Sequence, residues 1–198
     1  MEEKTIYMAG HILNEAMVDY REKQHNEVEK IIGVRPYSPH QDKSINDKAN
    51  TIQEGLAERI LKNDFKAMQE SDIFVFDVLN EGLGTIAEIG IVLGMKHQAH
   101  KLAEAYDNSI YTTTSENIAE EIKEAKRIIN KPVLCYCSDI RQGHGKSYID
   151  PDRAEFSTNQ FVYGSVLSLT NGEGFISWEE VKEKLASLGS EANVWYWD

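Results

Sequence analysis

The chain has 198 residues, enough for one substantial core, and its 41% hydrophobic and 27% charged residues are typical of a globular protein. Its 21 Lys and Arg against 33 Asp and Glu give a formal net charge of -12, which argues against a nucleic-acid polymer as partner because phosphate backbones are bound by basic residues. An apolar run of about 18 residues and a signal-peptide pattern are both absent, so we expect no membrane partner and a cytoplasmic location.

The first quarter of the chain predicts two strands around one helix. Residues 5–10 predict a buried strand that ends at Gly10. Asn14 is a typical N-cap for the helix that follows, to about residue 32. Residues 34–37 predict a short second strand, which Pro36 places at a sheet edge or strand end because proline donates no ladder hydrogen bond.

The middle of the chain predicts a loop, a second helix and the clearest strand. Residues 40–50 are polar and predict a loop, and apolar residues at helical spacing indicate a helix from about residue 49 to 70. Residues 72–79 are almost continuously apolar, which indicates a strand buried on both faces, as in a parallel sheet. A glycine turn at 82–84 then leads into a helix over about residues 85–96.

Residues 97–130 are long, polar and partly helical, with the helical part at 116–129. Since they separate two core elements, we expect a helical insertion there. The apolar run 132–137 predicts a fourth strand. Its two cysteines, Cys135 and Cys137, are expected to be small buried residues, because a structural zinc site normally has four ligands.

The last part of the chain predicts a short helix at 159–164, a fifth strand at 166–169 and a helix at 178–188. Strands that alternate with helices indicate an α/β doubly wound parallel sheet with right-handed crossovers. Our first expectation is a five-stranded flavodoxin-like sheet. We expect residues 1–198 to form a single domain around it.

One segment after the central strand carries the strongest chemical signal. Gly84 and Thr85 can begin a helix whose first amides face a pocket at the carboxyl edge of the sheet. Glu88 follows within the first turn or so, flanked by apolar residues, and a carboxylate in such surroundings is a candidate nucleophile or base. The simpler alternative is a glutamate that stabilises the positive end of its helix.

The same segment, Gly-Thr-x-x-Glu-Ile-Gly at 84–90, resembles the signature region of the nucleoside 2-deoxyribosyltransferase family. Other segments match that family in the same order along the chain. Residues 4–10 resemble its opening strand, 63–64 its Asn-Asp pair, 138–141 an Asp-x-Arg of one branch, and 159–164 its Asn-rich segment. The resemblance covers most of the core and leaves out residues 97–130.

The resemblance implies transfer of a 2-deoxyribosyl group between nucleobases, as in nucleotide salvage, through a covalent glycosyl-enzyme on Glu88. Tyr7 would orient Glu88, and Asp64 or Asp77 would protonate the leaving base. Asn159 would contact the sugar hydroxyls of its own or a neighbouring subunit. This chemistry is physically reasonable, because a carboxylate can stabilise an oxocarbenium-like transition state and then bond to it, and the departing base needs a proton.

Gly10, His11 and Gly84 are expected to line the substrate pocket, because they lie where the strands end. The histidines show no metal-ligand spacing, so we expect no metal, and nothing implies a cofactor. The expected partners are a nucleoside and a nucleobase. The resemblance also implies a homo-oligomer, a dimer or hexamer, and the aromatic residues at 194–198 would suit a contact with a neighbouring subunit.

The chain departs from the family in one place. Many members carry an aspartate five or six residues before the catalytic glutamate, where this chain has Gly82 and Leu83. Leu83-Gly84 is also similar to related N-glycosidases, so hydrolysis of a nucleoside or nucleoside 5′-monophosphate is the alternative activity. A non-catalytic nucleoside-binding protein with the same fold is a third possibility.

Overall fold

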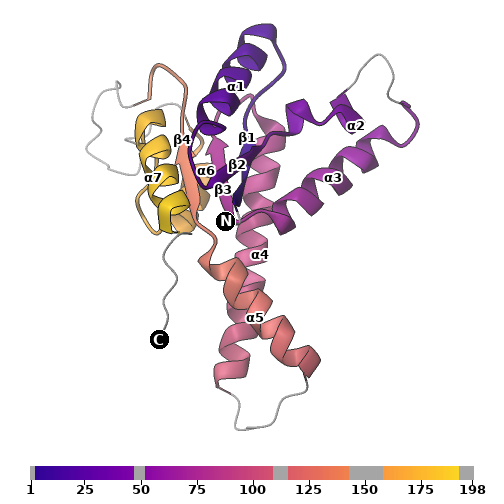
Figure 1. Cartoon of the computed structure of the whole chain (residues 1–198), viewed down its shortest axis with the longest axis vertical. Coiled ribbons are helices and arrows are strands. Elements are labelled where there is room, and N and C mark those ends of the chain that lie inside the picture. The colour runs from indigo at the N-terminus through magenta and orange to yellow at the C-terminus, as the bar shows by residue number, and fades with distance from the viewer. Residues whose placement is uncertain (1–2, 47–51, 109–115, 143–157, 192–198) are drawn as a thin grey trace.

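A four-stranded parallel sheet forms the centre of the computed structural model, which describes residues 3–46, 52–108, 116–142 and 158–191 (Figure 1). Its order is β2-β1-β3-β4, and every neighbouring pair is parallel. The strands are β1 (Lys4–Ala9), β2 (Val34–Tyr37), β3 (Ile73–Asp77) and β4 (Val133–Tyr136). These are four of the five predicted strands, and the order agrees with a flavodoxin-like sheet.

The predicted fifth strand is wrong. Residues 166–169 belong to the helix α6 (Gln160–Leu169), which begins where the Asn159 side chain accepts hydrogen bonds from two backbone amides. A continuous apolar run fits a buried strand and a buried helix equally well, and here the N-cap favours the helix. Within the described residues, the place beside β4 is taken by a single bridge between Cys135 and Phe175.

Helices cover both faces of the sheet. The helices α3 (Leu56–Glu70), α4 (Leu83–Asp107) and α6 pack on one face, and α1 (Glu15–Val28) and α7 (Trp178–Glu191) pack on the other. Alternate residues of a strand point to opposite faces, so β3 contributes to both layers and is buried along its whole length, as its composition predicted. Each layer joins one sheet face to its helices.

The longest helix, α4, continues past the predicted end at residue 96 to Asp107. Its lower half packs antiparallel to α5 (Glu116–Asn130), and the pair projects away from the sheet (Figure 1). Lys96 connects them to the start of β4, because its Nζ donates to the carbonyl oxygens of Ile129 and Lys131 at 2.7 and 2.6 Å. None of the described helices is both long and apolar enough to cross a bilayer.

Two short helices follow β2, at the edge of the sheet. The 3-10 helix η1 spans Pro39–Gln41 and α2 spans Lys43–Asn46, in a region where the sequence predicted a loop. Asp42 lies between them, and both its amide and its carboxylate contact neighbouring residues. This connection brings polar side chains close to the carboxyl end of β1.

Candidate active site

A cavity of about 230 Å³ lies at the carboxyl end of the sheet. Its lining comes from the residues that follow β1, β2 and β3, together with parts of α1, α3 and α4. Five of the eight predicted site residues line it: Gly10, His11, Asp64, Gly84 and Glu88. This is where ligands bind in open parallel sheets, because the connecting loops diverge there.

Tyr7 lies outside the cavity lining but contacts Glu88, which is part of it. The Tyr7 hydroxyl donates a hydrogen bond of 2.7 Å to Oε1 of Glu88. Tyr7 is completely buried and its ring stacks on Tyr37, with 5.8 Å between ring centroids, so the hydroxyl is held in place. Burial and the nearby Glu88 raise the pKa of Tyr7 far above its ordinary value, which keeps the phenol protonated as a donor.

The carboxyl group of Glu88 is adapted to gain and lose a proton near neutral pH. Its pKa is raised to about 7, because burial and the nearby Asp64 raise it by more than the Tyr7 hydrogen bond lowers it. Glu88 lies in the second turn of α4, because the helix begins at Leu83, two residues before the predicted start. It therefore reaches the cavity while Ile89, the next residue, is in the core.

Asp64 is the second carboxyl group in the cavity. It lies on α3 and is half-buried, and its Oδ1 is buried without a hydrogen-bond partner in the described part of the chain. Burial and the charge of Asp42 raise its pKa to about 6. A buried oxygen without a partner is costly in the folded protein, so its position in a cavity is suited to a ligand that completes the contact.

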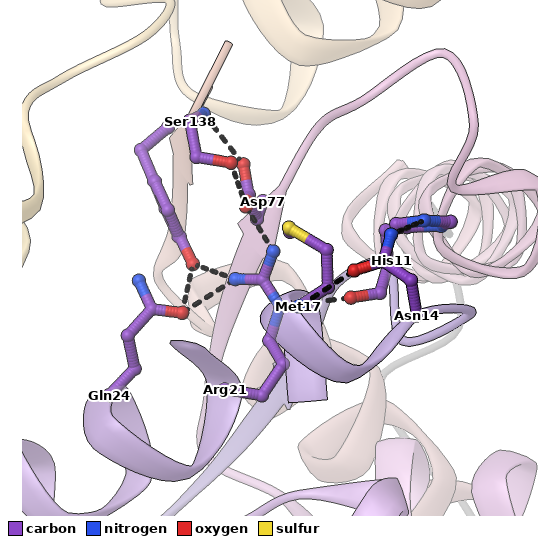
Figure 2. A network of polar contacts seen from close by, with 8 residues as sticks. His11, Asn14, Met17, Arg21, Gln24, Asp77 and Ser138 are labelled. Atoms are coloured by element: carbon purple, nitrogen blue, oxygen red, sulfur yellow. Dashed lines mark hydrogen bonds and ion pairs between the residues drawn. The ribbon is translucent and has the colours of Figure 1, made fainter. Parts of the chain in front are cut away.

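Asp77 lies outside the cavity lining, in a buried polar network (Figure 2). Its carboxylate pairs with the Arg21 guanidinium and accepts from the Ser138 amide and hydroxyl at 2.9 and 2.6 Å. Arg21 also donates to Gln24 and Tyr136, at 2.5 and 2.7 Å. Asp77 is thus engaged in joining α1, β3 and the end of β4, whereas Asp64 faces the cavity.

Asn159 lies outside the cavity lining as well. Its side chain is exposed, and its Oδ1 accepts from the amides of Phe161 and Val162 at 2.9 and 3.4 Å. In this chain the residue therefore caps α6. A contact between Asn159 and the sugar of its own or a neighbouring subunit stays a prediction.

The cavity wall also contains residues that the sequence analysis did not assign to the site, and two of them, Arg21 and Gln24, are buried polar residues. Both are buried on α1, and Gln24 accepts from Arg21 and from Tyr136. A Cβ at Gly10 would lie 2.5 Å from Cζ of Arg21, so a larger residue there would displace this guanidinium from its contact with Asp77. The sequence held only a weak signal for these two residues. Arg21 and Gln24 are three positions apart and therefore share a face of the helix, but a polar helix face is more often solvated than buried.

The described residues hold no group of three or more His, Cys, Asp or Glu placed to bind a metal ion. His11 lines the cavity, and its Nδ1 is buried without a hydrogen-bond partner among these residues. The lining therefore includes three carboxyl groups, those of Asp64, Glu81 and Glu88, and the imidazoles of His11 and His40. These groups are suited to proton transfer and to attack on an electrophilic carbon.

Comparisons with known proteins relate the chain to solved structures. Neither a protein-family model nor a curated protein matches the sequence. A conserved protein from Enterococcus faecalis V583 is similar in structure, with a TM-score of 0.55 and 19% identity, over 94% of this chain and 99% of that protein. A 2-deoxyribosyltransferase from Bacillus psychrosaccharolyticus aligns with a TM-score of 0.42 and 16% identity, over 91% and 95% of the two chains. The likeness to the Enterococcus protein shows a common fold over nearly the whole chain.

Proposed function

We propose that this chain transfers a 2-deoxyribosyl group between nucleobases, with Glu88 as the nucleophile. The observation that carries the proposal is the pairing of Glu88, oriented by Tyr7, with Asp64 in one cavity. Two carboxyl groups, one to attack the anomeric carbon and one to deliver a proton, are what a double-displacement glycosyl transfer requires. The resemblance of residues 84–90 to the family signature agrees with this assignment.

In the first half of the reaction, Glu88 replaces the departing base. Tyr7 holds Oε1, so we assign the attack on the sugar C1′ to Oε2. The C1′–Oε2 bond forms as the C1′–N bond breaks, and the bonding electron pair leaves with the base. Asp64 donates its proton to a nitrogen of the base, which makes the base a neutral leaving group. The product is a deoxyribosyl ester on Glu88.

In the second half, another base takes the sugar. A ring nitrogen of the incoming base attacks C1′, the C1′–Oε2 bond breaks, and Glu88 becomes a carboxylate again. The proton displaced from the incoming base returns to Asp64, which restores the starting state of the protein. If water attacked instead, the same groups would hydrolyse the nucleoside, so the outcome depends on which nucleophile occupies the cavity.

The charge of the cavity favours a nucleoside over a nucleoside 5′-monophosphate. Arg21 is the only Lys or Arg among the described residues of the lining, and it is paired with Asp77. The same lining contains the acidic residues Asp64, Glu81 and Glu88. A phosphate dianion would therefore enter a region of like charge with no unpaired guanidinium or ammonium among these residues to receive it.

Nucleobase exchange tests the proposal directly. With deoxyinosine and free adenine, the protein should produce deoxyadenosine and hypoxanthine, and Glu88→Gln should abolish the exchange. Glu104→Gln is a matched control, because Glu104 is an exposed residue of the same helix, outside the cavity lining. Hypoxanthine and free deoxyribose without deoxyadenosine would indicate a hydrolase. Exchange that persists at full rate in Glu88→Gln and Glu88→Ala would refute the role of Glu88.

A further inference from the structure

Asp42, which lies outside the cavity lining, has a carboxylate that is fixed on both oxygens. The Ser44 amide and hydroxyl donate to its Oδ1 at 2.9 and 2.6 Å, and the Tyr37 hydroxyl donates to its Oδ2 at 3.2 Å. Asn63 in turn donates to the Ser44 hydroxyl at 2.9 Å, which joins this group to the residue next to Asp64. The connection after β2 is thereby attached to α3 through a chain of polar contacts.

These contacts keep Asp42 ionised. Burial alone would raise its pKa, but the hydrogen bonds from Ser44, Tyr37 and Asn63 outweigh burial and hold the pKa below its ordinary value. Its negative charge is one of the two causes that raise the pKa of Asp64, the other being burial. Asp42 is therefore a permanent anion whose field acts on the proposed acid.

The other groups around Asp64 come from three elements. Glu88 on α4, Tyr7 on β1 and Tyr37 on β2 all interact with it electrostatically, and both tyrosines have raised pKa values and stay neutral. The histidines at 11 and 40 line the same cavity. No ion pair to Asp64 is present among the described residues. Asp42 thus acts on Asp64 without an opposing salt bridge from this part of the chain.

Glu88 and Asp64 compete for one proton. The pKa of Glu88 is about 7 and that of Asp64 about 6, so at intermediate pH the pair holds a single proton. The proposed reaction needs that proton on Asp64 and a negative charge on Glu88. Any contact that moves the proton towards Asp64 therefore increases the reactive fraction of the protein.

We propose that Asp42 is a positioning residue that moves this shared proton from Glu88 towards Asp64. Its fixed charge disfavours a second carboxylate at Asp64, while the Tyr7 hydroxyl stabilises the carboxylate at Glu88. The charge of Asp42 acts on Asp64 and the Tyr7 hydroxyl acts on Glu88, and both effects favour the proton on Asp64. Asp42 touches no substrate in this scheme, and the inference rests on the proposed function for its consequence in catalysis.

Carboxyl titration by NMR tests the inference without any substrate. In protein labelled with 13C at the Asp and Glu carboxyl groups, Asp42→Asn should lower the titration midpoint of Asp64 by about one pH unit. Asp42→Glu keeps the charge and should leave the midpoint near the wild-type value. Asp19→Asn removes the same charge from an exposed position of α1 and should have no effect on Asp64. An Asp64 midpoint that is unchanged in Asp42→Asn would overturn the inference.

Exchange kinetics provide the second measurement. In Asp42→Asn, kcat should fall about tenfold with little change in KM, and Asp42→Glu should recover most of the rate. A fall in kcat with an unmoved Asp64 midpoint would mean that Asp42 acts through structure alone, which contradicts the inference. If the wild-type protein exchanges no bases, the proposed function fails, whereas the titration still decides the role of Asp42. Should Asp42→Asn not fold, Asp42→Ser removes the same charge with a smaller side chain.

Discussion

The Tyr7 hydroxyl lies 2.7 Å from Oε1 of Glu88, although 81 positions separate the two residues in the sequence. The contact joins the first strand of the sheet to the helix that follows its central strand. Because Tyr7 is completely buried, the hydroxyl has little freedom to move away. A carboxylate held in this way has one oxygen bound, and in the proposed reaction the other oxygen attacks the sugar.

Tyr7→Phe should shift the pH dependence of base exchange. Loss of the hydroxyl removes the contact that lowers the pKa of Glu88, so the carboxylate is protonated at a higher pH than in the wild type. The acid side of the kcat/KM profile should move to higher pH, with at least about a tenfold loss near pH 6, since a hydrogen bond to a charged group contributes about 1.5–3 kcal/mol. Tyr106→Phe, on the far end of α4, is the control. A profile identical to the wild type would contradict the role of Tyr7.

The wild-type profile itself should be bell-shaped. Below about pH 6 both Glu88 and Asp64 are protonated and the nucleophile is lost, and above about pH 7 both are ionised and the acid is lost. The maximum should therefore lie between the two values, measured as kcat/KM for exchange in buffers of constant ionic strength. Activity that stays constant from about pH 5 to about pH 9 would show that this pair does not control the reaction.

Glu88→Gln should stabilise the folded protein at alkaline pH while it removes activity. A raised carboxyl pKa means that the folded state holds the proton more tightly than the unfolded state, so the free energy of unfolding falls as the pH rises from about 4.5 to about 7. The variant should be more stable than the wild type by about 2–3 kcal/mol at pH values above this range and similar to it below. Urea unfolding at several pH values measures the difference. Equal stability throughout would mean that Glu88 is not buried in solution.

Asp77→Asn should destabilise the protein rather than act on substrate affinity alone. The change leaves the buried Arg21 guanidinium without its counter-charge, and breaking a buried ion pair from one side costs about 3–5 kcal/mol. Chemical denaturation at neutral pH provides the measurement. The double variant Arg21→Met with Asp77→Asn should recover part of the loss, because no charge then remains unpaired. A loss below about 1 kcal/mol would show that the pair is hydrated in solution.

Gly33→Ala and Gly94→Ala should have opposite effects on stability. Gly33 has a φ of 85°, and a Cβ there would lie 2.4 Å from the carbonyl oxygen of Gly189 in α7. Both features make alanine unfavourable, so the free energy of unfolding should fall by more than about 1 kcal/mol. Gly94 lies inside α4, where an added Cβ would meet no neighbouring atom within 4 Å, and alanine there should add about 0.5–1 kcal/mol. Thermal unfolding of both variants tests the pair, and a stabilising Gly33→Ala would contradict the packing of α7 against β2.

The sequence alone determined the four strands, because each carries a local signal: an apolar run of strand length with a glycine, proline or polar boundary. It also singled out Glu88 as a candidate, since the glycine turn and the helix start lie within a few residues of it. It could not assign residues 166–169, because an apolar run of this kind satisfies a buried strand and a buried helix alike. The end of α4 was also predicted wrongly. The helix continues beyond residue 96 because α5 covers its apolar side there, and the sequence gives no local sign of that contact.

Only the tertiary structure gives a reason to propose Asp64 rather than Asp77 as the acid, since the two were equal candidates from their local surroundings. Asp77 is neutralised by Arg21 of α1 and bound by Ser138 after β4, whereas Asp64 keeps a buried oxygen without a partner among the described residues of the cavity. Asp42 escaped the sequence analysis altogether, since its effect depends on a fold that brings it to α3. The protonation of a carboxyl group is set by burial and by charges a few ångströms away in space, and those neighbours come from distant parts of the chain.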